Sequence, residues 1–236
     1  MKKMFLAVAL CLASLCVFAQ DNTLSESMKA DGWKLLWNGK DLQGWMIEKT
    51  GKAPTQGWTV KDGCLIANEI PDQRGGSIIT VGEYTNFILS IDFKLTKGAN
   101  SGIKYFVVPG KYNASEIGCE FQILDDMVHP DAQLGVAGNR TLSSLYDLIP
   151  ADKSAVKFDY YDWNNAMVIV IGNHVEHWLN GVKVVEYERN TQEFNALVAY
   201  SKFKNFKGFG NAASGHILIQ DHSDKVFYKN IMIKEL

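Results

Sequence analysis

Short runs in which apolar and polar residues alternate recur along most of this chain of 236 residues, and this pattern limits the folds open to it. In the run 87–95, Leu89, Ile91 and Phe93 alternate with polar residues, which is the period of a strand buried on one face. The dipeptides Asp62-Gly63 and Asn180-Gly181 separate pairs of such runs and accept the positive φ angles of tight hairpins. We therefore expect an all-β chain folded as an antiparallel β-sandwich, in particular a jelly roll, with helical periodicity only near 24–30. The strands are expected at 58–61, 64–67, 77–80, 87–95, 103–108, 119–124, 166–171, 174–179, 182–188, 216–220 and 226–233.

The first 19 residues predict a cleaved secretory signal peptide. Lys2 and Lys3 precede the apolar run 4–18, and Val17 and Ala19 are small residues at the −3 and −1 positions of a cleavage site. The run is too short to span a membrane and no second apolar segment follows, so we expect no membrane insertion. The residues before the two cysteines of this segment do not suit a lipoprotein signal. We expect a secreted, periplasmic protein with a single domain over residues 20–236.

Charge and cysteine content exclude several function classes. Without Lys2 and Lys3, the formal charge changes from −2 to −4, and no basic stripe suggests a nucleic-acid partner. Cys64 and Cys119 remain after cleavage, and either a disulfide between them or two buried free thiols fits their strand-like surroundings. No Cys-x-x-Cys or His-Glu-x-x-His motif supports redox chemistry or a zinc site.

The run 119–124 carries the strongest sign of a binding site. Cys119, Phe121 and Ile123 alternate with Glu120 and Gln122, so a carboxylate and an amide lie side by side on the face opposite the core. If the strands are neighbours in one sheet, this face also carries further polar side chains from other strands. The resulting candidate residues for a polar cleft are Lys104, Glu120, Gln122, Gln220 and His222, with Asp125 and His129 just past the strand end.

The spacing of Glu120, Gln122 and Asp125 also suggests a second possibility. It is close to Glu-x-Asp-x-x-Glu, the catalytic strand of laminarinase-like retaining β-glucanases, which place two carboxylates on one strand face. Gln122 cannot ionise, however, and Asp125 is shorter than Glu. Without a bulge, Asp126 rather than Asp125 follows Glu120 and Gln122 on the same face. The two-carboxylate glycosidase therefore stays a weakened alternative.

Aromatic residues and one histidine complete the candidates. The chain has six tryptophans, most of which we expect in the core, while Tyr146 and Trp163 flank a loop and are candidates for the rim of a sugar-binding cleft. A non-catalytic carbohydrate-binding module is therefore another alternative. His177 shares strand parity with Val175 and Leu179, so a half-buried histidine is the simpler interpretation. His174 and His177 point to opposite sides of a strand, which excludes them as a metal-binding pair.

Several segments in order along the chain together resemble the family of 3-keto-disaccharide hydrolases, also described as 3-ketoglycoside hydrolases or lyases. These proteins are secreted jelly rolls of the concanavalin A-like or LamG-like type, which is the fold the resemblance implies here. In this family the segment before the tyrosine that corresponds to Tyr146 is usually rich in glycine, whereas here residues 138–144 read GNRTLSS. The matching segments are 36–45 (LWNGKDLQGW), 100–104 (NSGIK), 120–125 (EFQILD), 145–150 (LYDLIP), 163–164 (WN), 178–181 (WLNG), 219–222 (IQDH) and 228–231 (YKNI).

The resemblance implies a particular chemistry. A partner glycoside 3-oxidoreductase oxidises C3 of a glucoside, and the ketone acidifies the proton on C2. A base removes this proton, the C1 substituent leaves by elimination, and added water completes net hydrolysis; hydrolase and lyase outcomes both remain open. Glu120 is the preferred base, with His177 or His222 as alternative base or acid. Lys104, Gln122 and Gln220 would hold hydroxyls or the enolate oxygen, and Asp125 with His129 would orient the sugar or help to hold a divalent metal ion.

Overall fold

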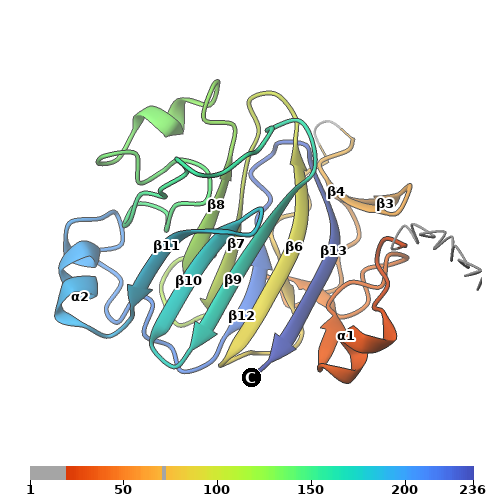
Figure 1. The fold of residues 1–236 in the computed structure, drawn as a ribbon, viewed down its shortest axis with the longest axis horizontal. Coiled ribbons are helices and arrows are strands. Elements are labelled where there is room, and N and C mark those ends of the chain that lie inside the picture. The colour runs from red at the N-terminus through yellow and green to blue at the C-terminus, as the bar shows by residue number, and fades with distance from the viewer. Residues whose placement is uncertain (1–19, 71–72) are drawn as a thin grey trace, which may run out of the picture.

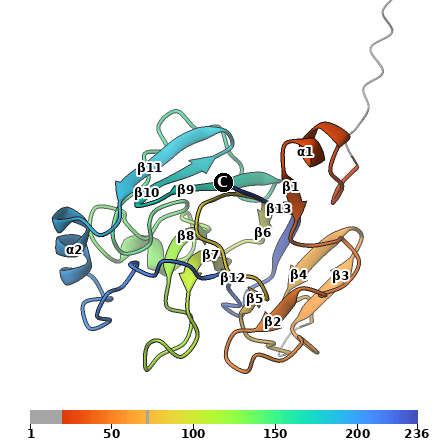
Figure 2. The ribbon, with the colours of Figure 1, turned by 90° about the horizontal axis from the view of Figure 1, so that it is seen from below.

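The computed structural model describes residues 20–70 and 73–236 as two antiparallel sheets packed face to face. Figures 1 and 2 show the layers from two sides, with the loop between β7 and β8 projecting away from the larger sheet. The all-β jelly-roll prediction is confirmed. The predicted signal peptide falls on residues 1–19 and lies outside the described residues. None of the helices in the described ranges is long and apolar enough to cross a membrane.

The larger sheet has eight strands in the order β11-β10-β9-β6-β13-β4-β3, with β1 paired to β13. Its hairpins turn where the sequence predicts, because Asp62, Gly63, Asn180 and Gly181 all adopt positive φ angles between 49° and 78°. The strands are β1 (Trp33–Leu35), β3 (Trp58–Lys61), β4 (Cys64–Ala67), β6 (Phe87–Leu95), β9 (Asn164–Ile171), β10 (His174–Leu179), β11 (Val182–Glu188) and β13 (Val226–Glu235).

The smaller sheet has five strands in the order β2-β5-β12-β7-β8. Strands β7 and β8 pair from Asn100 opposite Leu124 to Tyr105 opposite Cys119, and β12 pairs with the other edge of β7. The strands are β2 (Trp45–Ile47), β5 (Ile78–Thr80), β7 (Asn100–Val107), β8 (Cys119–Leu124) and β12 (His216–Ile219).

Within residues 20–70 and 73–236, three short helices lie outside the sheets. The predicted helix near 24–30 is α1 (Glu26–Ala30), which Ser25 caps. The 3-10 helix η1 (Pro130–Gln133) and the helix α2 (Gln192–Ala199) were not predicted. Helix α2 begins at the cap residue Thr191, and its eight residues bury Phe194 and pack Val198 against the core.

The core fills the space between the sheets. Alternate residues of β6, such as Phe87, Leu89 and Ile91, meet residues of β7 and β8, such as Tyr105 and Phe121, and all are at most 1% exposed. The intervening residues of β7 and β8 therefore point to the outer face of the smaller sheet. This outer face carries the polar side chains.

Cys64 and Cys119, the two cysteines in the described part of the chain, are free thiols, so the disulfide that the sequence left open does not form. Cys64 lies in β4 of the larger sheet and is partly exposed, whereas Cys119 is buried in β8 of the smaller sheet. Burial raises the pKa of the Cys119 thiol to about 11, which makes it unreactive at neutral pH.

Candidate active site

The outer face of the smaller sheet carries an ion pair between Lys104 and Glu120. The two residues are direct neighbours across the β7–β8 ladder, with Lys104 Nζ 3.4 Å from Glu120 Oε2. Both are nearly covered, at 7% and 4% exposed. Because each charge compensates the cost of burying the other, the pair holds a carboxylate in a site from which most water is excluded.

Gly102 provides the space in which the Glu120 carboxylate lies. A Cβ atom at this position would stand 2.1 Å from Glu120 Oε1 and 2.9 Å from Cδ. The φ angle of Gly102 is not positive, so the glycine is required by this close approach and not by backbone conformation.

Amide side chains surround the carboxylate. With its amide nitrogen directed toward the strand β7, Gln122 donates to the backbone oxygen of Ser101 at 2.9 Å and to Glu120 Oε1 at 3.3 Å. The backbone N–H of Gln220 donates to the carbonyl of Gly102, which places the Gln220 side chain beside the pair. A small polar pocket results, lined by Asn100, Glu120, Gln122, Tyr146, Lys202, Gln220 and His222.

Tyr146 forms one wall of this pocket. Its backbone N–H donates to the Glu120 carbonyl, and its hydroxyl donates to Asp131 Oδ2 at 2.7 Å. Arg140 holds this wall by pairing with Asp131 at 3.0 Å and with Asp147 at 2.6 Å. Burial and the Asp131 carboxylate raise the pKa of Tyr146 well above its usual value, so the phenol stays protonated as a donor.

Lys202 lines the pocket beside Tyr146, and part of its side chain is exposed to solvent. Its ammonium lies 4.1 Å above the Tyr146 ring, a cation–π contact. Loss of hydration lowers the pKa of Lys202. The Glu120 carboxylate acts in the opposite direction and raises this pKa, while the positive charges of Lys104 and Arg140 lower it by smaller amounts. The sequence analysis missed this residue because a single lysine after a helix carries no distinguishing pattern.

His129, His222 and Asp224 form a possible set of metal ligands at the edge of the pocket. One ligand atom from each lies within 4.8 Å of the others. Nδ1 of His129 accepts the backbone N–H of Asp131, so Nε2 is the nitrogen that remains for a metal. Asp224 Oδ2 accepts the backbone N–H of Asn100, which leaves Oδ1. Two imidazoles and a carboxylate fit a divalent transition metal such as zinc.

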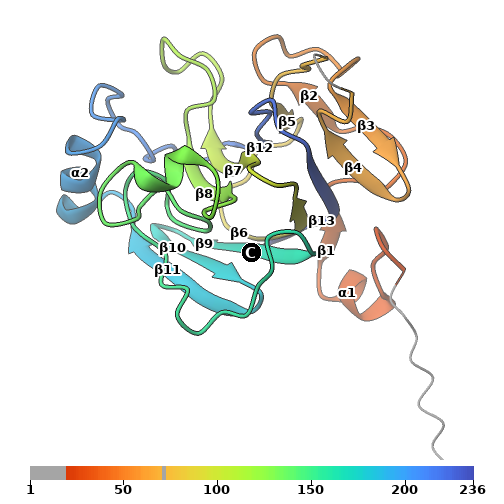
Figure 3. The same ribbon diagram turned by 90° about the horizontal axis from the view of Figure 1, so that it is seen from above.

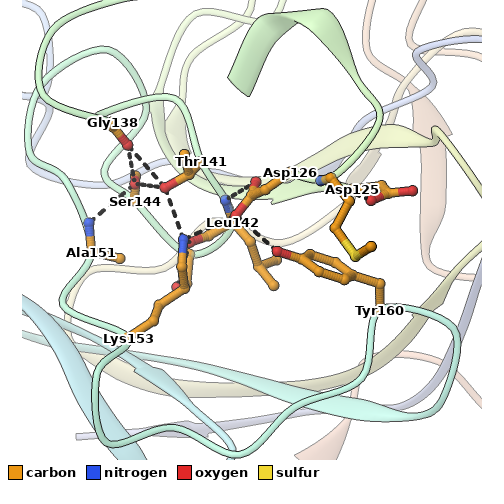
Figure 4. Close-up of polar contacts among 11 residues, drawn as sticks. Asp125, Asp126, Gly138, Thr141, Leu142, Ser144, Ala151, Lys153 and Tyr160 are labelled. Carbon is orange, nitrogen blue, oxygen red and sulfur yellow. Dashed lines mark hydrogen bonds and ion pairs between the residues drawn. The ribbon is translucent and has the colours of Figure 1, made fainter. Parts of the chain in front are cut away.

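Asp125 does not lie in the pocket, contrary to the prediction that it orients the sugar. It is 0% exposed, and its carboxylate accepts the backbone N–H groups of Gly98 and Met127 and the Tyr161 hydroxyl. Asp126 is likewise engaged, with Lys153 and the backbone N–H of Leu142 (Figure 4). Both carboxylates organise the loop after β8, which removes the second carboxylate that a laminarinase-like site needs.

We expect Asp125→Asn to lower the free energy of unfolding by about 1–3 kcal/mol, because the amide mismatches one of the three donors. Turnover well below the unfolding temperature should change little. Urea denaturation and initial rates on the same preparations check both parts. If Asp125→Asn is stable but its turnover falls by orders of magnitude, the result would instead support the laminarinase-like mechanism with two carboxylates.

His177 is also outside the pocket, so the structure does not support its predicted catalytic role. It is 0% exposed in the core, where it contacts the Tyr105 hydroxyl at 2.8 Å and the Ser143 carbonyl at 3.0 Å. The strand parity with Val175 and Leu179 explains this position, because all three point toward the core. Its contact with Ser143 anchors the loop that leads to Tyr146.

Burial lowers the pKa of His177 to about 4, which predicts a specific pH dependence of stability. Since the unfolded histidine binds a proton below about pH 6.5, stability is fully present above that pH and is lost as the pH falls toward 4. Between pH 7 and pH 5 we expect this residue to remove roughly 2 kcal/mol from the free energy of unfolding. Urea denaturation of the wild type and of His177→Gln checks this, and equal pH slopes would contradict it.

Trp163 lies on the outer face of the larger sheet, away from the predicted cleft rim. Lys229 Nζ and Lys94 Nζ are 4.4 and 5.2 Å from its ring centre. Lys94 alternates with the core residues of β6 and therefore points outward, and Trp163 packs against it.

Of the other predicted residues, the pocket contains Glu120, Gln122, Tyr146, Gln220 and His222, while Lys104 and His129 lie beside it.

Jelly-roll sandwiches include lectin domains, and a polar pocket with an aromatic wall suits the binding of a sugar. The family described as the 3-keto-alpha-glucoside-1,2-lyase-like domain matches residues 32–234. The chain belongs to this family.

Similar proteins agree with this assignment. A protein of Bacteroides thetaiotaomicron named 3-keto-disaccharide hydrolase is 34% identical over 92% of this chain and 83% of its own length. A crystal structure from Parabacteroides distasonis, described as a glycosyl hydrolase, superimposes with a TM-score of 0.79 at 32% identity, covering 92% of this chain and all of that one. A second such structure from the same species has a TM-score of 0.65 at 26% identity, covering 86% of this chain and 99% of that one. These relatives support a carbohydrate-cleaving enzyme.

Proposed function

We propose that this protein cleaves glycosides whose glucose ring carries a ketone at C3, starting with removal of the proton at C2. The observation that carries the proposal is the single carboxylate of Glu120 among the described pocket-lining residues, surrounded by hydrogen-bond donors. Elimination next to a ketone needs one base and donors for the enolate oxygen, and it does not need two facing carboxylates. The relative named 3-keto-disaccharide hydrolase supports the substrate class.

Each step has a residue in the pocket. Glu120 takes the C2 proton, and the electron pair of the C–H bond moves toward the C3 oxygen, which becomes an enolate. Lys104 pairs with this carboxylate, Gln122 donates to it, and Asn100 lines the same pocket; these groups would stabilise the oxygen. The enolate then collapses, the C1–oxygen bond breaks, and the leaving group takes a proton. Water added across the new double bond gives net hydrolysis.

Two side chains are placed to supply the leaving group's proton. Lys202 has a lowered pKa and lines the pocket near Tyr146, and His222 lines it on the side of β12. The lowered pKa makes the ammonium of Lys202 a better acid than an ordinary lysine. A mechanism with Glu120 as base and Lys202 as acid follows from these positions; His222 is the alternative acid only when it does not hold a metal ion.

A divalent metal held by His129, His222 and Asp224 would polarise neighbouring oxygens of the oxidised sugar. We expect Zn²⁺ or Mn²⁺ to raise the melting temperature of the wild type, with a stabilisation that grows as the metal concentration rises above Kd. His129→Ala should abolish the shift, whereas Glu26→Gln, at an exposed carboxylate outside this ligand set, should not. Calorimetric titration of the metal-free protein measures the binding directly, and equal binding by wild type and His129→Ala would contradict the site.

The proposal is tested by incubating the purified protein with a glucoside and with its 3-keto derivative. We expect turnover of the 3-keto derivative and none of the plain glucoside. Turnover of the plain glucoside alone would favour a laminarinase-like glycosidase, and binding of both without turnover would favour a carbohydrate-binding module. Mass analysis of the products distinguishes a hydrated sugar from an unsaturated one, and thus hydrolase from lyase.

The location and pathway follow as parts of the same proposal. The signal-like pattern of residues 1–19 supports secretion to the periplasm, without a membrane or lipid anchor. A ketone at C3 must be made by oxidation of a glycoside, so a glycoside 3-oxidoreductase would supply the substrate.

A further inference from the structure

A second pocket, here called the α2 pocket, lies between helix α2 and strand β11 at one edge of the larger sheet (Figure 3). Its apolar lining consists of Ile149, Tyr187, Phe194 and Leu197, and its volume is about 380 Å³. The rings of Tyr187 and Phe194 stack with their centroids 5.6 Å apart, so the strand and the helix share one apolar surface. This volume is within the range of small-molecule sites. The mechanism proposed above uses none of these residues.

The charge of the α2 pocket is negative. Glu186, Glu188 and Glu193 line it, and none of its described lining residues is basic. Lys183 pairs with Glu186, and His174 pairs with Glu188. Glu193 makes no ion pair within residues 20–70 and 73–236, so its carboxylate keeps its full negative charge. A cation is therefore attracted to this pocket, and an anion is repelled.

The apolar lining requires a ligand that is more than a charge. A small hydrated cation gains little from exposed carboxylates, because water screens the attraction. An apolar body would cover Ile149 and Leu197 and remove their surface from water, which adds a favourable hydrophobic contribution. A neutral apolar ligand would gain nothing from the three carboxylates. The combination favours an ammonium ion that carries an alkyl or aryl group.

The turn 145–149 connects the α2 pocket with the catalytic pocket. Two backbone hydrogen bonds between Leu145 and Ile149, at 3.0 and 2.9 Å, close this turn. Ile149 lines the α2 pocket, and Tyr146 in the same turn lines the catalytic pocket. A contact that fixes Ile149 therefore also restrains the wall that Tyr146 forms.

Helix α2 makes a second connection between the two pockets. The chain that leaves its C-terminal end reaches Lys202, whose side chain lines the catalytic pocket. The backbone N–H of Lys202 donates to Asp147 Oδ2 at 2.7 Å, and Asp147 belongs to the turn 145–149. Phe194 is the one buried residue of the helix, so few contacts hold it in place. A ligand that contacts both Leu197 and Ile149 would attach the helix more firmly to the turn.

We propose that the α2 pocket binds a small organic cation with an apolar body, and that this ligand holds the turn and the helix in the arrangement described above. Substrate binding then requires less ordering of Tyr146 and Lys202, so the ligand lowers KM. Binding to the α2 pocket does not depend on the proposed function, whereas the effect on KM rests on it.

The binding test uses benzyltrimethylammonium as the probe. Tetramethylammonium supplies the charge without the apolar body, and benzyl alcohol supplies the apolar body without the charge. In calorimetric titrations of the purified protein, we expect benzyltrimethylammonium to bind more tightly than either. Glu193→Gln should weaken this binding about two- to fivefold, the effect of one exposed ion pair. The matched control is Glu26→Gln, because Glu26 lies in the first turn of α1 as Glu193 does in α2.

Three results of this test would overturn the binding site. They are no binding of benzyltrimethylammonium, equal affinity for one of the two partial probes, and equal affinity of the wild type and Glu193→Gln. Analytical ultracentrifugation adds a fourth, because a dimer that Leu197→Ser dissociates would assign the pocket to a second copy of this chain.

The effect on the catalytic pocket is measured in two ways. Saturating benzyltrimethylammonium should slow hydrogen exchange of the Ile149 N–H, which closes the turn, and should lower KM for the 3-keto-glycoside about fivefold. Unchanged exchange or an unchanged KM with the probe bound would overturn the coupling. If the wild type does not turn over the 3-keto-glycoside at all, the proposed function fails, and hydrogen exchange still decides whether the two pockets are coupled.

Discussion

Replacement of Glu120 by glutamine is expected to reduce kcat/KM on the 3-keto-glycoside by about 10²–10⁴-fold, the usual contribution of a positioned base. The amide keeps the size of the side chain but cannot accept a proton from C2. Because the proton acceptor acts in the step that removes the C2 proton, the loss should fall on kcat more than on KM. Initial rates over a range of substrate concentrations measure this split.

The control for this experiment must account for stability, because Lys104 would be left buried without its anion. Breaking a buried ion pair costs about 3–5 kcal/mol, so the variant is assayed only at temperatures where circular dichroism shows it folded. Glu26→Gln changes an exposed carboxylate on α1 and should keep full activity. Full turnover by folded Glu120→Gln would assign the base to another residue, with His222 the next to test.

Replacement of Gly102 by alanine is expected to reduce kcat by about 10–100-fold, although it replaces no polar side chain of the site. The added methyl would stand 2.1 Å from Glu120 Oε1, so the carboxylate must move away from its position beside β7. A displacement of about 1 Å of a reacting group is enough for a loss of this size. Steady-state kinetics on the 3-keto-glycoside check the prediction.

Gly82→Ala provides the matched control for this second substitution. Gly82 also has an ordinary φ angle, and its added methyl would approach the end of the Tyr84 side chain at 3.1 Å, outside the site. We expect this variant to keep its kcat. If Gly102→Ala folds and also keeps the wild-type kcat, then the observed position of the Glu120 carboxylate is not the one that matters for turnover.

The pattern of the sequence predicts the fold well because several strands of the larger sheet alternate between buried and less buried residues. Alternation in β6, β8, β10 and β13 marks which residues face the core, and positive φ angles at Asn180 and Gly181 are a local requirement of the hairpin. Helix α2 was not predicted because it has only eight residues, and the helical spacing of Phe194, Leu197 and Val198 is too short a run to indicate a helix by itself.

Sequence alternation likewise predicts some residues of the candidate site and not others. Glu120, Gln122 and Lys104 lie on strands whose parity the sequence reveals, so their common face follows from alternation. Lys202 and Asp224 come from loops far away in the chain, and no local pattern connects them with β8. Asp125, His177 and Trp163 show the opposite error, because residues of the right type for a site are used for loop bonds, core contacts and the opposite sheet.

By itself, the sequence determined the all-β sandwich, its hairpin turns, and the alternation that sends Glu120 and Gln122 to the face opposite the core. These features depend on neighbours within a few residues, and local periodicity records them. Only the tertiary structure decided which carboxylates are engaged in loops and that Gly102 leaves space for Glu120. Those facts depend on strand order and loop paths, which bring together residues distant in the chain.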